Sequence, residues 1–434
     1  MAESAAGRPP TGPTPRSPAP AAPTPANRTS GTPPSATPPP ATPTGPGLLK
    51  RLVLRHYRRF APALDIAGEA YAAAVVGYEA FDRHNADVQD ALSAELSRVL
   101  AARSTFELWR LGKRFEADFA RYCGRRAAIG TASGTAALQI ALVAAGVGPG
   151  DEVITSAHTF LATLLAIRNT GARPVLVDPD PGDLCVRPEA VRRAITTRTR
   201  AIVPVHMHGH VADVAPLLAL GLPVIEDCAQ AHGATRDGQR VPIGPTGCFS
   251  FFASKPLGGA GNGGAIVTDD EGLAERAERA RDPEGSDPIV LRAARTPSYI
   301  DPLEAAVLTA RLPKLASWRA ARAANAAAYR AAFAELAPVL PAAGVESAWY
   351  SFVVRIDDRD AVKRRVLLGG VETKIEYATP VHLSPTFADE GWRHGDFPVA
   401  EAAAARGLSL PLHPFLTTAE RDRVITAVRR ALRR

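Results

Sequence analysis

Residues 151–178 read DEVITSAHTFLATLLAIRNTGARPVLVD, in which two short apolar runs flank an apolar stretch of helical periodicity. This pattern predicts strands at 151–155 and 174–178 and a helix at 160–170. Two strands joined by such a helical crossover run parallel to each other. Because both runs are almost wholly apolar, we expect a parallel sheet that is covered on both faces.

The same alternation of strand and helix continues on both sides of this unit. Further strands are expected at 126–130, 200–205 and 222–227, and further helices at 135–145, 188–195 and 211–220. After Asp227 the alternation stops. The rest of the chain predicts strands at 248–253 and 264–268, a long helical stretch at 302–336, strands near 349–356 and 372–377, and a final helix from Thr418. Ligands of such α/β sheets bind beyond the carboxyl ends of the parallel strands.

Composition and pattern divide the chain into four expected parts. They are a disordered Pro/Ala/Thr-rich tail at 1–47, a helical N-terminal extension at 48–100, a large α/β domain with a mostly parallel mixed sheet at 101–295, and a smaller C-terminal α+β domain at 296–434. The tail holds 15 of the 39 prolines and no aromatic residue, so it cannot bury enough apolar area to offset its ordering entropy. The first part of the extension docks either on the main body or on a partner chain, and the sequence leaves both open.

Charge and cysteine usage exclude several classes of protein. The 434 residues carry a net charge of +7, but the basic residues are not interleaved with the aromatic side chains of a nucleic-acid-binding surface. No apolar run reaches membrane-spanning length, so we expect neither nucleic acid nor membrane as a partner. The four cysteines lie far apart, which excludes a disulfide scaffold and a CxxC zinc site, and no metal is expected. Isolated thiols and the lack of a readable secretory signal predict a cytoplasmic protein.

Three segments that follow predicted strands carry residues suited to chemistry. The first, Ala132-Ser-Gly-Thr-Ala-Ala137, opens an apolar helix, and such a helix start binds anions through its free N–H groups. A plain N-cap role for Ser133 or Thr135 explains the same residues equally well. The second segment places Asp227 at the end of an apolar strand, with Gln230 three residues further. A carboxylate in that position is either a ligand to a cationic group or an N-cap or ion-pair partner.

The third segment, Phe249-Ser-Phe-Phe-Ala-Ser-Lys255, delivers a lysine from a buried strand into a glycine-rich loop. A lysine there is costly unless it is paired, neutral or used covalently, and a desolvated lysine is a candidate for Schiff-base chemistry. A structural lysine that ties down the loop is the alternative. The loop also matches GxGxxG from Gly259 to Gly264, but a dinucleotide fingerprint opens a helix, whereas Ala265-Ile-Val-Thr268 continues as a strand.

Together these residues suit pyridoxal 5′-phosphate (PLP). The helix start would hold the phosphate, Lys255 would form the Schiff base, and Asp227 would keep the pyridine nitrogen protonated, which makes the ring an electron sink. Phe160 would stack on the ring.

The sequence is similar to the DegT/DnrJ/EryC1/StrS aminotransferases over about residues 85–434. The matching motifs include Ala132–Leu138, Gly148–Ile154 with Ala157–Phe160, Val203–His206, Ile225–Gly233, Phe249–Lys255, Gly261–Gly264, Thr379–Leu383, Asp396–Glu401 and Leu408–Leu412. The resemblance implies the fold-type-I fold of PLP-dependent transferases and a homodimer. It also implies transfer of an amino group from glutamate or glutamine to a keto-sugar, with a nucleotide-linked sugar favoured, or to a cyclitol, in natural-product or polysaccharide biosynthesis.

The resemblance also implies roles for single residues. Lys255 takes the Schiff-base role and shuttles the proton, whereas the sugar dehydratases of the family carry histidine at this position. The other cofactor-binding positions are Gly134, Thr135, Ala136 and Ser250 at the phosphate, Phe160 against the ring, Asp227 at the pyridine nitrogen and Gln230 near the ring oxygen.

Three segments differ from the usual family pattern. Pro297-Ser298-Tyr299 replaces an Asn-x-Arg motif, Asp282-Pro-Glu-Gly285 replaces Asn-His-Gly, and Gly261-Asn-Gly-Gly264 replaces Gly-Asp-Gly-Gly. These differences keep two alternatives open. One is an enzyme similar to the aminohydroxybenzoate synthases, suggested by Leu108-Trp-Arg-Leu-Gly112, and the other is a PLP-binding pseudoenzyme that acts as a partner or regulator.

Overall fold

The computed structural model describes residues 75–282 and 297–433. The tail predicted at 1–47 and the first part of the predicted extension lie outside the described residues, as do residues 283–296. Within the described part of the chain, none of the helices has the length and apolar character needed to cross a membrane.

The large sheet in the described part of the chain has seven strands. They are β1 (Ala127–Thr131), β2 (Glu152–Ser156), β3 (Arg173–Val177), β4 (Thr199–Val203), β5 (Glu226–Asp227), β8 (Thr246–Ser250) and β9 (Gly264–Thr268). Two groups, β1-β9-β8-β5 and β3-β2-β4, are joined by parallel bridges from Ile202 to Val224 and from Val205 to Asp227. Among these seven strands β9 runs antiparallel to its neighbours and the rest run parallel, as the alternating pattern predicts.

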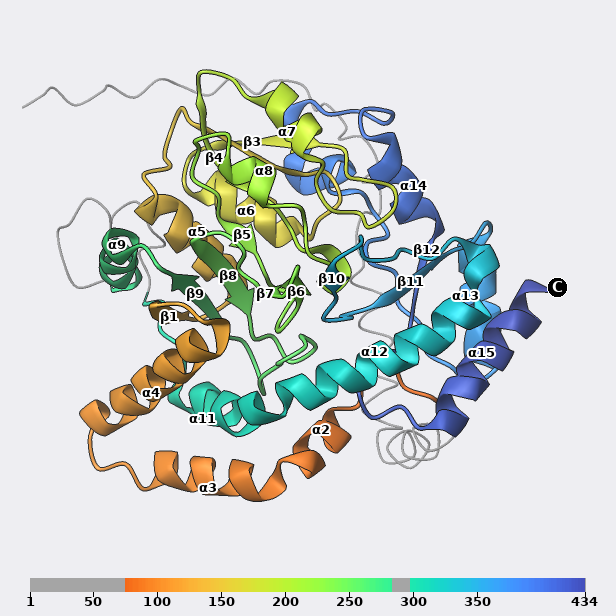
Figure 1. The fold of residues 1–434 in the computed structure, drawn as a ribbon, viewed down its shortest axis with the longest axis horizontal. Helices are drawn as coiled ribbons and strands as arrows, with labels where there is room; N and C mark the ends of the chain where they lie inside the picture. The colour runs from red at the N-terminus through yellow and green to blue at the C-terminus, as the bar shows by residue number, and fades with distance from the viewer. Residues whose placement is uncertain (1–74, 283–296, 434) are drawn as a thin grey trace, which may run out of the picture. The chain divides into compact units, whose positions relative to one another are not determined.

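Helices cover both faces of this sheet. They are α5 (Gly134–Ala144), α6 (Leu161–Asn169), α7 (Pro188–Ala194), α8 (Ala215–Leu218) and α9 (Glu271–Arg281). Helix α5 packs against α6, α9, β8 and β9, and nearly all of its side chains are buried. Figure 1 shows α5 beside β8 and β9. Ile140 and Leu142 of α5 join Val153 and Ile266 of the strands in one apolar core.

The helix predicted at 211–220 is wrong in its first half, because α8 begins at Ala215. Residues 211–214 are irregular, and the backbone N–H of Ala212 donates to Nδ1 of His206 rather than to a helical carbonyl. Pro216 lies in the first turn, where its missing N–H is harmless, but it disfavours helix before Ala215. A short 3₁₀ turn, η1 (Met207–Gly209), precedes this segment.

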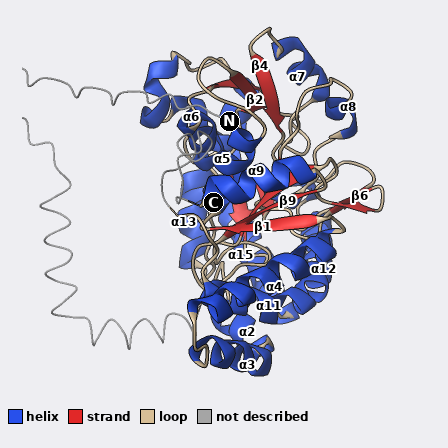
Figure 2. Ribbon diagram, turned by 90° about the vertical axis from the view of Figure 1, so that its left-hand side faces the viewer, coloured by secondary structure: helices blue, strands red, loops and turns tan. Residues whose placement is uncertain are grey.

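Three helices near the start of the described residues lie on the β1 side of this sheet. They are α2 (Phe81–Asp87), α3 (Gln89–Leu100) and α4 (Thr105–Cys123). Helix α4 begins after Ser104, whose Oγ accepts from the N–H of Glu107, and it ends at Gly124 in the left-handed conformation. Its buried Phe115 and Phe119 pack edge-on against Phe251, beyond the end of β8. Figure 2 shows α2, α3, α4 and α11 gathered on this side of the sheet.

The long helical stretch predicted at 302–336 is interrupted. It forms α11 (Pro302–Arg311), η2 (Leu312–Lys314), α12 (Leu315–Ala332) and η3 (Ala334–Leu336). Pro313 explains the break, since proline removes one helical hydrogen bond. Ala305 and Leu308 of α11 belong to the core around Phe115, whereas Tyr329 of α12 belongs to the C-terminal core.

The C-terminal core is built on one strand pair. Strand β11 (Phe352–Arg355) pairs antiparallel with β12 (Gly407–Leu410), and helices α13 (Arg359–Leu368), α14 (Pro398–Arg406) and α15 (Thr418–Leu432) pack around them. The smaller elements are β6 (Thr235–Arg236), β7 (Gln239–Arg240), β10 (Val345–Glu346), η4 (Val381–Leu383) and η5 (Pro385–Glu390). The predicted division into domains at residues 100 and 295 stays a prediction.

The strand predicted at 372–377 is wrong. The segment makes a single bridge, from Lys374 to Ser409 of β12, and then turns away from this edge. Beyond the bridge, the Glu376 side chain accepts from Ser351 Oγ and the Tyr377 hydroxyl accepts from Gln230. These side-chain contacts direct the segment toward the cavity instead of along the sheet.

Candidate active site

A cavity of about 400 Å³ lies where the carboxyl ends of β4 and β5 meet the start of α5. Seven of the eight predicted site residues line it: Gly134, Thr135, Phe160, Asp227, Gln230, Ser250 and Lys255. The eighth, Ala136, is not among the lining residues, and its N–H donates to Ser133 Oγ at 3.1 Å. The structure therefore brings together residues that lie up to 121 positions apart in the chain, from Gly134 to Lys255.

The start of α5 forms a polar cradle at one end of the cavity. Ser133 is the N-cap of α5, because its Oγ accepts from the N–H of Ala136. The N–H groups of Gly134 and Thr135 nevertheless have no acceptor among the described residues. A Cβ on Gly134 would lie 2.7 Å from Cβ of Ser250, so only glycine allows this approach. Two free N–H groups at the positive end of a helix dipole form a site for an anion such as a phosphate.

Asp227 is a buried carboxylate with both oxygens held. Thr163 Oγ1 donates to its Oδ2 at 2.9 Å, and the N–H of Ala229 donates to its Oδ1 at 3.1 Å. Burial raises the pKa of Asp227, and these two hydrogen bonds together with the charge of Lys255 act against that rise. A cationic group that enters the cavity would favour the ionised carboxylate further.

Gln230 is fixed by bonds at both ends of its amide. Its Oε1 accepts from the N–H of His208 at 2.7 Å, and its Nε2 donates to the Tyr377 hydroxyl at 2.9 Å. The ring of Tyr377 lies 5.5 Å from that of Phe160, measured between centroids, and Phe160 is about half exposed. Phe160 thus lines the cavity beside Tyr377, and its stacking on the cofactor ring stays a prediction.

Lys255 lies in the loop between β8 and β9, and its Nζ is 4.6 Å from the centroid of the Tyr350 ring. Burial lowers the pKa of Lys255, while the charges of Glu376 and Asp227 act in the opposite direction. A lysine whose ammonium form is disfavoured has more of the neutral amine that attacks an aldehyde.

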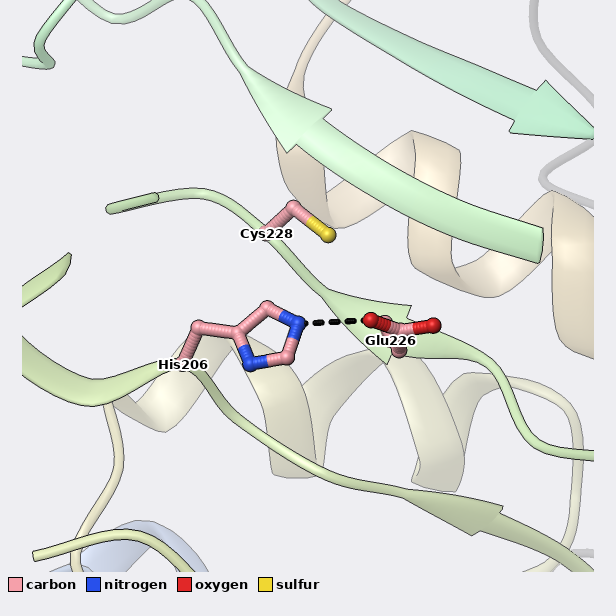
Figure 3. Close-up of side chains that lie close together, drawn as sticks. All are labelled: His206, Glu226 and Cys228. Carbon is pink, nitrogen blue, oxygen red and sulfur yellow. Dashed lines mark hydrogen bonds and ion pairs between the residues drawn. The ribbon is translucent and has the colours of Figure 1, made fainter. Parts of the chain in front are cut away.

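A second polar cluster lies directly behind Asp227. His206 Nε2 lies 2.7 Å from Glu226 Oε2, with the Cys228 sulfur close by (Figure 3). His206 Nδ1 accepts from the N–H of Ala212, so Nε2 carries the proton that Glu226 accepts, and neither ring nitrogen has a lone pair to spare for a metal. Burial also raises the pKa of the Cys228 thiol well above its ordinary value, which disfavours the thiolate a metal would need.

The two carboxylate oxygens of Glu226 also bind the backbone just before β8. They accept from the N–H groups of Ile243 and Gly244 at 2.8 and 2.5 Å. This cluster is therefore explained as structural support for the end of β5, which carries Asp227 into the cavity.

Comparison with known proteins identifies the family. Residues 88–429 match the model of the DegT/DnrJ/EryC1/StrS aminotransferase family. The chain belongs to this family. It is 43% identical over 323 residues to the erythromycin biosynthesis sensory transduction protein EryC1 of Saccharopolyspora erythraea, covering 73% of this chain and 88% of the relative. It is 44% identical over 323 residues to the dTDP-3-amino-3,4,6-trideoxy-alpha-D-glucose transaminase of Streptomyces venezuelae, covering 73% of this chain and 85% of the relative.

Solved structures show the same fold. The crystal structure of S. venezuelae DesV in complex with a ketimine intermediate aligns with a TM-score of 0.78 and 39% identity, covering 83% of this chain and 99% of that one. NtdA of Bacillus subtilis, with cofactor PMP bound, aligns with a TM-score of 0.73 and 28% identity, covering 83% and 86%. The predicted fold-type-I transferase fold is thereby confirmed, as is the prediction of an aminotransferase.

The residues of this family member fit PLP. The cavity supplies an anion cradle that a side chain on Gly134 would fill, a buried carboxylate at Asp227, an aromatic face at Phe160 and an amine at Lys255. These four groups match a phosphate, a ring nitrogen, a flat ring and an aldehyde, respectively. The assignment of each residue to its part of the cofactor stays a prediction.

Several lining residues were missed by the sequence analysis. They are Thr163, which bonds Asp227, and the aromatic residues Tyr350 and Tyr377. Glu376, whose charge acts on Lys255, was missed as well. Thr163 lies inside a predicted helix, and the others come from the C-terminal part of the chain, so nothing in their spacing marks them.

One segment that departs from the usual family pattern packs on its own chain. Ser298 is buried, its N–H donates to the carbonyl of Arg281, and its Oγ accepts from the N–H of Ala132 at 3.4 Å. Pro297–Tyr299 therefore supports the loop that leads from β1 to the α5 cradle. Asn262, which belongs to the segment that replaces Gly-Asp-Gly-Gly, lines the cavity. Most of the segment 282–285, which replaces Asn-His-Gly, lies outside the described residues.

Proposed function

We propose that this aminotransferase uses PLP to transfer an amino group from glutamate or glutamine to a keto-sugar. The observation that carries the proposal is the convergence of Lys255, Asp227 and the free N–H groups of the α5 start on one cavity. When bound, PLP supplies an electron sink that stabilises negative charge beside the amino group.

The residues of the chain have distinct tasks in this proposal. Lys255 binds the aldehyde of the cofactor through Nζ and afterwards accepts and returns a proton at the same atom. Asp227 holds a proton on the ring nitrogen with its negative charge. Gly134, Thr135 and Ser250 hold the phosphate, Phe160 covers the ring, and Gln230 lies near the ring oxygen. Proton transfer by a positioned side chain contributes roughly 10²–10⁴-fold to a rate.

A nucleotide-linked keto-sugar is the substrate we favour. Support comes from the S. venezuelae relative, whose name includes a dTDP-linked amino sugar. A cyclitol remains the second substrate class of the proposal, because a carbocyclic ketone presents similar hydroxyl groups.

We further propose a cytoplasmic homodimer. The four cysteines are free and buried, which suits a reducing compartment. Phe106 and Trp109 of α4 are 62% and 51% exposed and stack on each other, and exposed aromatic side chains of this kind are typical of interfaces. Analytical ultracentrifugation of wild type and Trp109→Ala tests this part.

The function is tested with the purified protein, PLP, a panel of amino acids and a panel of nucleotide-linked and carbocyclic ketones. Mass spectrometry of the products is expected to show a ketone that has gained an amino group, with glutamate or glutamine as donor. Lys255→Ala should yield no product. A protein that binds PLP but reacts with no donor in the panel would instead support the pseudoenzyme alternative.

A further inference from the structure

A second, smaller cavity of about 30 Å³ lies beside the main one. Both cavities are lined by Ser254 and Tyr350, and Ser254 directly precedes Lys255 in the chain. The small cavity therefore lies on the Lys255 side of the site. Its volume is close to the share of one water molecule in the liquid, so it holds one small polar group and not a whole substrate.

Arg322 of α12 presents a buried guanidinium to this cavity. The residue is 5% exposed, and the one hydrogen bond found for it in the described structure is a long one, 3.4 Å, to the carbonyl of Pro256. No carboxylate of the described residues pairs with it within 4.0 Å. Burial lowers the pKa of Arg322 to about 10, so the side chain remains a cation at neutral pH. A buried cation without a counter-charge is costly and calls for an anionic partner.

Two histidines add unused polar atoms to the same cavity. His84 and His413 are each 7% exposed, and neither Nε2 of His84 nor Nδ1 of His413 has a hydrogen-bond partner in the described part of the chain. Burial, followed by the charge of Arg322, lowers the pKa of His84 to about 3, so this ring is neutral. Burial also lowers the pKa of His413 to about 4. Each neutral ring has one N–H that it can donate to an anion.

The acidic group at this cavity is already neutralised. Glu79 lines it, but its carboxylate is bonded to the ammonium group of Lys374. Among the described residues of this cavity, Arg322 thus lacks a counter-charge, and three potential donors, the two histidine rings and the hydroxyl of Tyr78, lack a hydrogen-bond partner. All of these groups suit an oxygen anion.

We propose that the small cavity binds a carboxylate of the amino-acid donor, with Arg322 as the residue that pairs with it. The inference rests on the proposed function for its choice of ligand. A planar guanidinium matches the two oxygens of a carboxylate, and His84 and His413 flank them as donors. The amino group of the same molecule then lies in the main cavity near Lys255, because the two cavities adjoin at Ser254 and Tyr350.

The first test measures binding without turnover. Glutarate has two carboxylates and no amino group, so its binding to the PLP-loaded enzyme can be followed by calorimetry. Arg322→Gln is expected to weaken glutarate binding by roughly 30-fold or more, as for loss of one partner of a buried charge pair. Arg319→Gln is the matched control, since Arg319 lies one turn earlier on α12 and pairs with Glu346 outside both cavities. Equal binding to wild type and Arg322→Gln would overturn the inference.

A comparison of two ligands on the wild-type enzyme tests the inference even if Arg322→Gln fails to fold. Wild-type enzyme should bind glutarate but not its diamide, which has the same shape without charge. Equal binding of the two also overturns the inference. Because both measurements need no keto-sugar, an enzyme that binds glutarate through Arg322 but aminates no sugar would refute the proposed function alone.

Donor analogues then show which carboxylate is held. If Arg322 pairs with the side-chain carboxylate, wild type prefers glutamate over glutamine and norvaline in the half-reaction, and Arg322→Gln loses that preference. If it pairs with the carboxylate next to the amino group, all three donors lose affinity equally. Unchanged KM values for all three donors in Arg322→Gln would contradict both forms.

Discussion

Thr163 Oγ1 donates a hydrogen bond to Asp227 Oδ2 at 2.9 Å and so ties helix α6 to the end of β5. Because the Thr163 proton is used on Asp227, the hydroxyl of Thr159, 2.8 Å away, must donate to Thr163. The two threonines form a short chain of hydrogen bonds that ends on the carboxylate we assign to the cofactor ring. Thr163, which no sequence motif marks, is thereby connected to the carboxylate that we propose holds the cofactor ring.

Replacing Thr163 by valine should weaken cofactor binding. The change removes a hydrogen bond that lowers the pKa of Asp227, so the neutral carboxyl becomes more favourable. A hydrogen bond to a charged group contributes about 1.5–3 kcal/mol, so we expect a rise of at least tenfold in the Kd for PLP, measured by fluorescence titration. Thr159→Val keeps the bond between Thr163 and Asp227 and should have the smaller effect. Equal losses in the two variants would argue against the role of Thr163.

Replacing Gly134 by alanine should damage the cradle. The new Cβ would lie 2.7 Å from Cβ of Ser250, so the α5 start and β8 must separate, and overpacking of this kind costs about 1–3 kcal/mol. Urea denaturation of the cofactor-free protein should show this loss, together with weaker binding of phosphate and PLP.

The matched control for Gly134→Ala is Gly112→Ala in α4. A Cβ on Gly112 would meet Ile300 at an ordinary 3.7 Å, and alanine favours the helix over glycine by up to about 1 kcal/mol. We expect Gly112→Ala to be neutral or stabilising. Equal destabilisation by both changes would mean that the close approach at Gly134 is not the cause.

The reactivity of Lys255 should respond with opposite signs to two of its charged neighbours, Glu376 and Lys374. The carboxylate of Glu376 raises the pKa of Lys255 and the ammonium of Lys374 lowers it. The rate of PLP addition to the cofactor-free protein needs the neutral amine, so it should rise with pH and level off above the pKa of Lys255, below the ordinary lysine value of about 10.5. Glu376→Gln should move the midpoint to lower pH and Lys374→Met to higher pH. Shifts of both variants in one direction would refute this electrostatic description.

The buried His206–Glu226 pair should be a large contributor to stability. Glu226→Ala leaves three donors, the His206 ring and the N–H groups of Ile243 and Gly244, without an acceptor, and each buried donor left unsatisfied costs about 1–3 kcal/mol. Glu346→Ala removes an exposed pair with Arg319 and should cost less than about 1 kcal/mol. Chemical denaturation of the two variants provides the comparison, and similar costs would show that the buried cluster is not a structural anchor.

The periodic part of the fold was predictable from the sequence because each strand and helix carries its own pattern. The strands at 152–156, 173–177 and 264–268 lie within one residue of their predicted bounds. Prediction failed where a tertiary contact decides the backbone. At 211–214 the N–H of Ala212 bonds the His206 ring, and at 376–377 side chains turn toward the cavity instead of extending a sheet.

The same reasoning applies to the site. Lys255, Asp227 and the α5 start were predictable because each lies at or shortly after the carboxyl end of a buried strand, where ligands of α/β sheets bind. Tyr350, Tyr377 and Arg322 reach the cavities from the C-terminal half, and their approach depends on how the two cores pack together. No spacing along the chain encodes that packing.

The central claim is that Lys255 binds the cofactor covalently. PLP-loaded wild-type enzyme should be reduced with borohydride, digested and mapped by mass spectrometry. The account predicts that the cofactor mass is fixed on the peptide that contains Lys255, and that Lys255→Ala shows no such adduct. A colourless protein, or an adduct on another lysine such as Lys374 with the Lys255 peptide unmodified, would contradict the account.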